Sequence, residues 1–173
     1  VELISRGQLV LLRSQFYSGA SEQAMLQLDE WLEDLQRPGY ERVLAFAMSC
    51  KVHFLLWLQR PNEAERICQQ LQSHLDLLPA GRYSDAQFSL GLAQARLALS
   101  ERRADKAQVL LEAGLLKLVD EHQRERRLRL SLLLSVAYWR KGNDEKAFAL
   151  LRGTLEEAWA CGYRRLFEDD SLW

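Results

Sequence analysis

The residues most able to do acid–base or metal chemistry are scattered along this chain rather than grouped. The three histidines lie on different expected helices: His53, His74 and His122. The three cysteines are odd in number and form no CxxC pair: Cys50, Cys68 and Cys161. One CxxH spacing exists, from Cys50 to His53, but it supplies only two of the four ligands of a structural zinc site. Zinc needs closely spaced ligands, and an isolated histidine is usually a surface or core residue. We therefore expect reduced thiols, no metal site and no catalytic histidine.

Motifs that hold nucleotides or activate nucleophiles are missing as well. The chain has no GxxxxGK[ST] or GxGxxG loop and no HExxH, GxSxG or kinase-type set. Its carboxylate pairs are spread over expected outer faces and helix starts, where solvation and capping explain them: Asp29 with Glu33, Glu63 with Glu65, and Asp169 with Asp170. We therefore expect a protein that is not an enzyme and needs no cofactor within these residues.

Arginine and aromatic side chains are better candidates for a binding site. Helical periodicity places one group on the inner face of a helical array: Arg6, Arg13, Phe16, Tyr17, Ser49, His53, Trp57, Arg96, Arg129, Trp139 and Arg140. Rings beside guanidinium groups suit a sugar, an anionic metabolite or a peptide carboxylate. The predicted ligand-binding residues are Arg13, Tyr17, His53, Trp57, Arg96, Trp139 and Arg140. In the alternative interpretation, the rings of Phe16, Trp57 and Trp139 simply pack between adjacent repeats.

Amphipathic helices are expected to position these side chains. Apolar residues recur at three and four positions in segments separated by the three prolines, and strand-like alternation is absent. The expected helices cover residues 1–18, 21–36, 41–59, 62–78, 84–101, 105–121, 124–141 and 144–161. Their short connections favour antiparallel neighbours. Three helix starts carry expected capping residues, each followed by an acidic first turn: Ser21, Asn62 and Asn143.

A small residue recurs at the same point of every second expected helix. These residues are Ala24, Ala64, Ala107 and Ala147, separated by 40, 43 and 40 positions. Two helices of a hairpin cross closely there, and a larger side chain would push the backbones apart. The positions twelve residues earlier hold Leu12, Val52, Ala95 and Ser135, of which the last two are small.

This periodicity predicts an all-α fold, a tetratricopeptide-like superhelix of about four helix-turn-helix repeats with about eight antiparallel helices. A spacing near 40 residues exceeds the usual 34 and implies helices longer by about a turn. We expect a helical-repeat domain over residues 1–162 and a C-terminal tail over residues 163–173. The concave groove, formed mainly by the first helix of each pair, is the expected binding surface.

The C-terminal end carries the most specific pattern. It consists of residues 134–143 (LSVAYWRKGN), 146–151 (KAFALL) and 162–170 (GYRRLFEDD). These stretches resemble the last repeats of the MalT-like, LuxR-type large ATP-binding transcriptional regulators, where a Gly-Tyr-x-Arg-x-Phe-x-Asp-Glu-like segment closes the repeat region. Five residues match that closing segment: Gly162, Tyr163, Arg165, Phe167 and Asp169. Asp170 replaces the usual Glu.

The resemblance implies a bacterial signal-transduction ATPase in which a nucleotide-binding module, this repeat region and a C-terminal DNA-binding helix-turn-helix act together. Such a repeat region is similar to a sensor: an inducer binds it and helps release an autoinhibited monomer to self-associate and activate transcription. The implied partners are an inducer or peptide and other domains of the same regulator, with self-association possible. Because neither the Walker loop nor the DNA-reading helix lies here, this part is expected to make no direct contact with nucleic acid.

The net charge and the hydropathy pattern are those expected of a cytoplasmic protein without a membrane span. Lys and Arg number 23 and Asp and Glu 24, so the net charge of −1 gives no general attraction for nucleic acid or anionic membrane. The first residues lack a secretory pattern, and no run of 18 apolar residues exists, so we expect a part of a larger cytoplasmic protein. The basic run at residues 124–129 either touches phosphate or an acidic partner domain, or is the solvated start of a helix.

Three hypotheses for function are compatible with the sequence. The first is an effector-binding sensor module of a MalT-like activator. The second is a protein-interaction scaffold whose groove takes a peptide or domain and no small molecule. The third is an enzyme.

Overall fold

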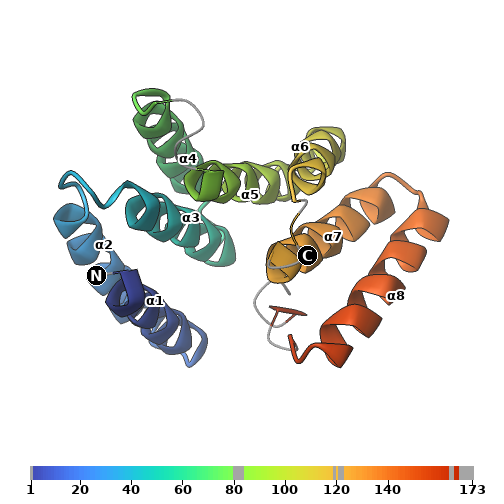
Figure 1. Cartoon of the computed structure of the whole chain (residues 1–173), viewed down its shortest axis with the longest axis horizontal. Coiled ribbons are helices and arrows are strands. Elements are labelled where there is room, and N and C mark those ends of the chain that lie inside the picture. Colours follow the sequence, from blue (N-terminus) through green and yellow to red (C-terminus); the bar gives the residue numbers. More distant parts are fainter. Residues whose placement is uncertain (1, 80–83, 119, 121–122, 164–165, 168–173) are drawn as a thin grey trace. The chain divides into compact units, whose positions relative to one another are not determined.

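The computed structural model shows an all-helical chain (Figure 1). It describes residues 2–79, 84–118, 120, 123–163 and 166–167, with only the backbone of residues 2–6. These residues form eight α-helices and no strand. The helices are α1 (Glu2–Tyr17), α2 (Ser21–Asp34), α3 (Glu41–Trp57), α4 (Pro61–Asp76), α5 (Ser84–Ser100), α6 (Ala104–Leu116), α7 (Arg124–Arg140) and α8 (Asp144–Ala160). The predicted all-α fold is confirmed.

The helix boundaries lie within two residues of the expected ones, except at the end of α6. That helix was expected to continue to residue 121, but it ends at Leu116. The backbone N–H groups of Lys117 and Leu118 bond to the carbonyls three residues earlier, at Gly114 and Leu115, so the chain tightens into a turn there.

The expected capping residue is right at one helix start and wrong at two. The Oδ1 atom of Asn143 accepts a hydrogen bond from the backbone N–H of Lys146 at 3.3 Å, as a capping residue should. Ser21 and Asn62 do not cap, because each already belongs to the helix that it was expected to precede. Pro61 takes the first position of α4, where its missing N–H costs no hydrogen bond.

One turn geometry recurs at four helix-to-helix connections. Each turn holds a residue with positive φ: Gly19 (98°), Gln59 (58°), Arg102 (58°) and Gly142 (75°). The N–H of the next residue bonds to the carbonyl five residues earlier, as in Ala20 to Gln15 and Asn143 to Tyr138, which closes the helix end. The positive-φ residues keep the 40, 43 and 40 spacing of the alanines.

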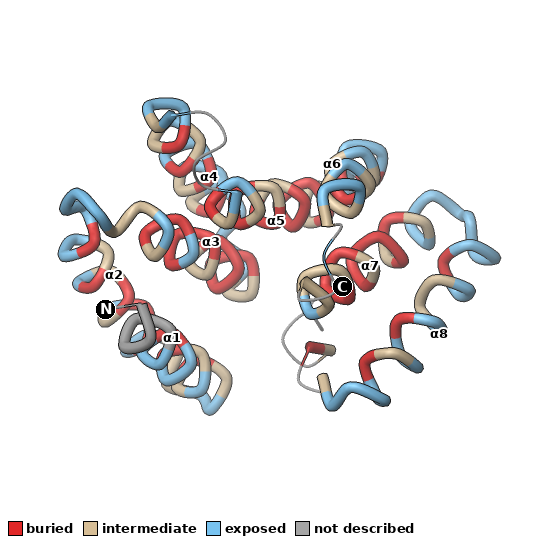
Figure 2. Tube along the Cα trace, viewed as in Figure 1, coloured by how far each residue is buried: buried red, intermediate tan, exposed pale blue. Residues whose placement is uncertain are grey.

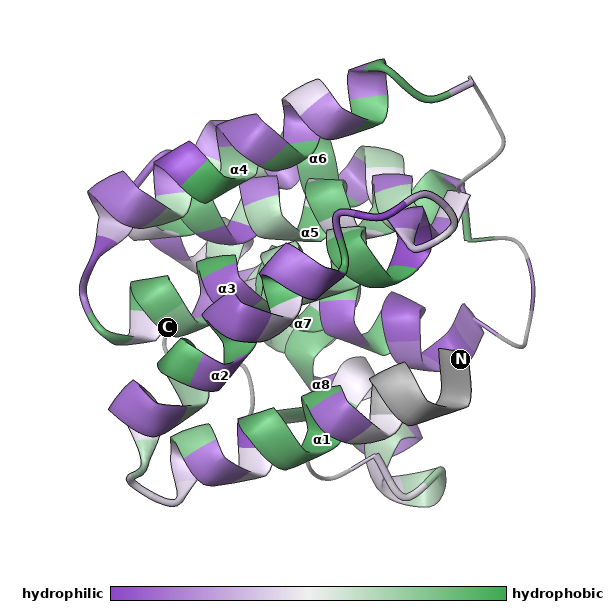
Figure 3. Ribbon diagram, turned by 90° about the vertical axis from the view of Figure 1, so that its left-hand side faces the viewer, coloured by the Kyte–Doolittle hydropathy of each residue, from purple (hydrophilic) through white to green (hydrophobic). Residues whose placement is uncertain are grey.

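The recurring alanines are buried, as the sequence pattern predicts. Ala24, Ala64 and Ala107 have no exposed surface, and Ala147 is almost fully buried. The residues twelve positions earlier are buried too, although two of them are large: Leu12, Val52, Ala95 and Ser135. The amphipathic character of the helices is visible in Figure 3, where hydrophobic and hydrophilic residues alternate along each helix.

The chain forms two compact units that divide within α5, residues 1–93 and 94–173. In the first unit, α1 packs against α2, and α3 packs against both of them and against α4. In the second unit, α7 packs against α6 and α8. Figure 2 shows more buried positions along α3 and α7 than along α8, most of whose residues are exposed or partly exposed. No helix in the described ranges is long and apolar enough to cross a membrane.

A larger side chain at a recurring alanine should destabilise the fold. For Ala107→Leu we expect a loss of about 1–3 kcal/mol in the free energy of unfolding, because the extra atoms have no space between the two helices. Urea denaturation followed by circular dichroism measures it. Ala149→Leu, at an exposed position of α8, is the matched control and should change stability little. Equal stability of the two variants would contradict the close crossing.

Candidate functional site

The first unit brings together three predicted ligand-binding residues at the ends of α1 and α3. Tyr17 ends α1 and Trp57 ends α3. The Tyr17 hydroxyl lies 2.8 Å from Nε2 of His53, a hydrogen-bond distance. The rings of Tyr17 and Trp57 meet edge to face, with centroids 5.3 Å apart and planes at 77°. We call Tyr17, His53 and Trp57 the ring cluster.

Two phenylalanines pack against the ring cluster. Phe16 and Phe54 stack with centroids 3.9 Å apart and planes at 3°. Both are buried, so for Phe16 the alternative interpretation, packing between helices, is confirmed. Phe54 was not predicted as part of the site. Phe54 is fully buried, and the sequence alone does not distinguish it from the other apolar residues of the core.

The ring cluster presents part of its surface to solvent. His53 is only 3 % exposed, while Tyr17 and Trp57 are half-buried. Arg13 is also half-buried and lies one turn before Tyr17 on α1, a spacing that puts both side chains on one face. This arrangement offers two aromatic edges, a hydroxyl held by a buried imidazole and a nearby guanidinium. It suits a ligand with a flat apolar face and an anionic group.

The other three predicted residues belong to the second unit. Arg96 is 4 % exposed, so its guanidinium is a buried group rather than a surface one. Nη1 of Arg140 donates a hydrogen bond to the carbonyl of Leu99, at the end of α5. Loss of hydration there lowers the pKa of Arg140, and the positive charge of Arg102 lowers it further. Arg140 therefore holds the α5 end, a role the sequence pattern did not indicate.

The remaining residues expected on the inner face are mostly buried. Ser49 lies in the core, and Arg129 is buried with Nη2 at 3.3 Å from Oε1 of Glu125. The side chain of Arg6 falls outside the described residues. The first helices of the hairpins thus contribute to the core more than to an open surface.

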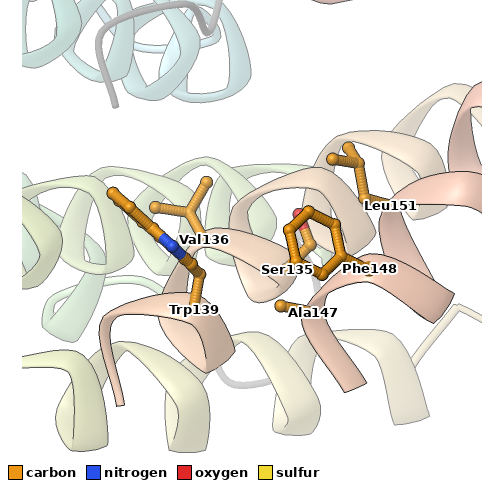
Figure 4. A pocket seen from close by; sticks show the side chains of 6 residues that line it. All are labelled: Ser135, Val136, Trp139, Ala147, Phe148 and Leu151. Atoms are coloured by element: carbon orange, nitrogen blue, oxygen red, sulfur yellow. The ribbon is translucent and has the colours of Figure 1, made fainter. Parts of the chain in front are cut away.

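Trp139 does not pack between helices as the alternative interpretation proposed, since it is 54 % exposed. It lines a shallow apolar groove between α7 and α8, shown in Figure 4. The lining residues are Ser135, Val136, Trp139, Ala147, Phe148 and Leu151. The lining includes the two small residues at the helix crossing, Ser135 and Ala147.

Polar contacts join α6 to α7 in the second unit. The Tyr138 hydroxyl and the Gln108 amide donate hydrogen bonds to Oε1 of Glu112 at 2.9 and 2.8 Å. These bonds hold the pKa of Glu112 below its ordinary value, the bond from Gln108 having the larger effect, and the same carboxylate raises the pKa of Tyr138. Nζ of Lys141 lies 2.7 Å from Oδ1 of Asp105. Sequence reasoning missed this network.

The basic run at the start of α7 pairs with α8 instead of being only solvated. Arg127 and Arg124 approach Oε1 of Glu157 at 3.0 and 3.4 Å. Arg124 also donates to Sγ of Cys161 at 3.3 Å. The three cysteines are free thiols, and no group of His, Cys, Asp and Glu within the described part of the chain could hold a metal ion.

The described part of the closing segment packs on the last hairpin. Leu166 is buried with Leu128 and Ala158, and Tyr163 and Phe167 pack against this cluster. His122, Arg165, Asp169 and Asp170 fall outside the described residues.

Comparison with protein-family models, with curated proteins and with solved structures finds no match for this chain.

Removing the Tyr17 hydroxyl should weaken the fold of the first unit. We expect Tyr17→Phe to lower the free energy of unfolding by about 1 kcal/mol, because a partner of the buried His53 is lost. Thermal and urea denaturation measure this. Tyr40→Phe, at a half-buried tyrosine on the same unit, is the control and should leave stability nearly unchanged. If the two variants behave alike, the hydroxyl does not stabilise the cluster.

Glu112 should give the second unit an acid-sensitive stability. A carboxyl whose pKa is lowered by folding stabilises the protein above its unfolded-state pKa, and this contribution is lost as pH falls through the folded-state pKa. We expect Glu112→Gln to be less stable than the parent at neutral pH and to lose stability less steeply on acidification. Melting temperatures measured from neutral to acidic pH test this. Glu156→Gln, at an exposed glutamate of α8, should retain the parent profile.

Proposed function

We propose that this chain is a recognition module that binds an effector at the ring cluster and has no catalytic activity or cofactor of its own. The observation that carries the proposal is the Tyr17–His53 hydrogen bond beside the Trp57 ring. A half-buried tyrosine and tryptophan next to a buried, hydrogen-bonded imidazole form a preorganised surface. Such a surface binds a ligand with little further loss of side-chain entropy.

The ring cluster lies where binding can change helix packing. Tyr17 and Arg13 belong to α1, whereas His53 and Trp57 belong to α3, the first helix of the next hairpin. A ligand that contacts both helices stabilises the arrangement in which they are closest. An effector shifts a conformational equilibrium only if it binds one arrangement better than the other, and a site divided between two hairpins meets that requirement.

We further propose that the module is the sensor region of a cytoplasmic bacterial regulator similar to the MalT-like LuxR-type activators. The support is the resemblance of residues 134–143, 146–151 and 162–170, together with the packing of Tyr163, Leu166 and Phe167 against the last hairpin. In this proposal, effector binding controls self-association of the regulator, and other domains contact ATP and DNA.

A thermal-shift screen of the purified chain against sugars, organic acids, amino acids and short peptides tests the proposal. A ligand present at about 100 times its dissociation constant stabilises the folded state by about 2.7 kcal/mol. We expect a hit whose effect is lost in the double variant Arg13→Gln, Trp57→Ala. Trp159→Ala, at an exposed tryptophan of α8, should keep the effect. Ligand binding that survives the double variant would remove the ring cluster as the site.

A protein-interaction scaffold without a small-molecule ligand is the second candidate. The exposed apolar groove between α7 and α8 favours it, because contiguous apolar surface of this kind commonly takes part in protein association. A screen in which peptides stabilise the chain and no metabolite does would favour the scaffold.

A further inference from the structure

The turn between α5 and α6 carries an arginine where two of the other turns have glycine. Arg102 has a φ of 58°, and its counterparts at the other three connections are Gly19, Gln59 and Gly142. A side chain in this left-handed conformation is strained, whereas glycine adopts the conformation freely. Strained residues are concentrated at functional sites, and an arginine here brings a guanidinium group to the end of the hairpin.

The end of α7 approaches the same turn. The carbonyl oxygen of Leu99 accepts a hydrogen bond from the backbone N–H of Arg102 at 3.0 Å and another from Nη1 of Arg140. Because both donors share one oxygen atom, the Arg140 guanidinium is held against the turn. Loss of hydration lowers the pKa of Arg140, and the positive charge of Arg102 lowers it further, as expected of two cations that lie close together.

The carboxylates beside the turn are paired with other cations. Oε2 of Glu101 lies 3.4 Å from Nη1 of Arg103, and Oδ1 of Asp105 lies 2.7 Å from Nζ of Lys141. The side chain of Arg102 forms no hydrogen bond or ion pair with the residues that the structure describes. Both arginines that approach the Leu99 carbonyl are exposed, so an anion from solution can reach them.

We propose that Arg102 and Arg140 bind a phosphate group between the α5–α6 turn and the end of α7. The planar set of N–H groups on a guanidinium matches two oxygens of a phosphate. A phosphate monoester carries up to two negative charges at neutral pH, which match the two cations. The hydrogen bond to Leu99 fixes the Arg140 guanidinium, so this side chain loses little further entropy when the anion binds.

A phosphate at this place connects two helices. Arg102 belongs to the turn that precedes α6, and Arg140 is the last residue of α7, which packs against α6. The anion replaces repulsion between two cations by attraction of both to one ligand, and it thereby stabilises the packing of α7 on α6. The site lies in the second unit, whereas the ring cluster lies in the first. The failure of one proposal therefore leaves the other unaffected.

An NMR titration of the 20.1 kDa chain with inorganic phosphate, at constant ionic strength, tests the proposal. The Nε–H signals of Arg102 and Arg140 should shift and reach saturation, whereas that of Arg152, an exposed arginine of α8, should not. A second titration with glycerol phosphate distinguishes a free phosphate ion from a phosphorylated metabolite, because the source is the probe that binds more tightly. A parent chain that shows no saturable shift with either probe overturns the proposal.

The variant Arg102→Gly removes the guanidinium and relieves the strained turn at the same time. We expect its dissociation constant for phosphate to rise by about tenfold or more, because a charged hydrogen-bond donor is lost. Its melting temperature without phosphate should be no lower than that of the parent, since glycine adopts a positive φ without strain. A substitution that only disturbed the structure would lower the melting temperature as well.

Two control variants separate the site from other effects. Gln59→Gly makes the same backbone change in the corresponding turn of the first unit. Arg152→Gln removes one positive charge from an exposed position of the second unit. Both variants should bind phosphate as the parent does. An Arg102→Gly variant that keeps the parent affinity overturns the proposal. An Arg152→Gln variant that loses as much affinity as Arg102→Gly overturns it too, because the attraction is then unspecific.

Discussion

Close approach of two helix backbones at one small residue is the constraint on which this fold depends. Ala24, Ala64, Ala107 and Ala147 occupy that point, and each lies five residues after a turn residue with positive φ. The turn fixes where the second helix starts, and the alanine fixes how near it lies. The turn and the alanine together therefore determine the register between the two helices of a hairpin. The larger side chains pack around that crossing.

The same register decides which side chains meet at the hairpin ends. Tyr17 and Trp57 each stand two residues before a positive-φ residue, and their rings meet because α1 and α3 pack side by side. Arg140 has the same place before Gly142, and it bonds to the carbonyl of Leu99 at the end of another helix. The residue two positions before each of these positive-φ residues thus makes the contact between hairpin ends. It is an aromatic residue in the first unit and an arginine in the second.

The helices could be predicted from the sequence because their signals are local and periodic. Apolar spacing, prolines and recurring alanines identified every helix, and Asn143 was recognised as a cap. The contacts that make up the site depend on which helices become neighbours. Phe54, and the pairing of Glu112 with Tyr138, carry no local signal for that reason. Phe16 and Trp139 occupy equivalent positions, yet one is covered by a third helix and the other is exposed. Residue type and spacing alone cannot distinguish these two outcomes.

The recurring turn also bears on how such a chain changes its length during evolution. A segment that runs from one positive-φ residue to the next contains every feature that defines a hairpin. These features are the turn, the small residue at the crossing and a groove for the following helix. Duplication of that segment inserts a hairpin that fits the one before it and accepts the one after it. Gln59 and Arg102 show that the turn forms even without glycine, at a cost of about 1–2 kcal/mol per residue. Gene duplication followed by drift can therefore lengthen or shorten the chain in steps of about forty residues while the core packing is preserved.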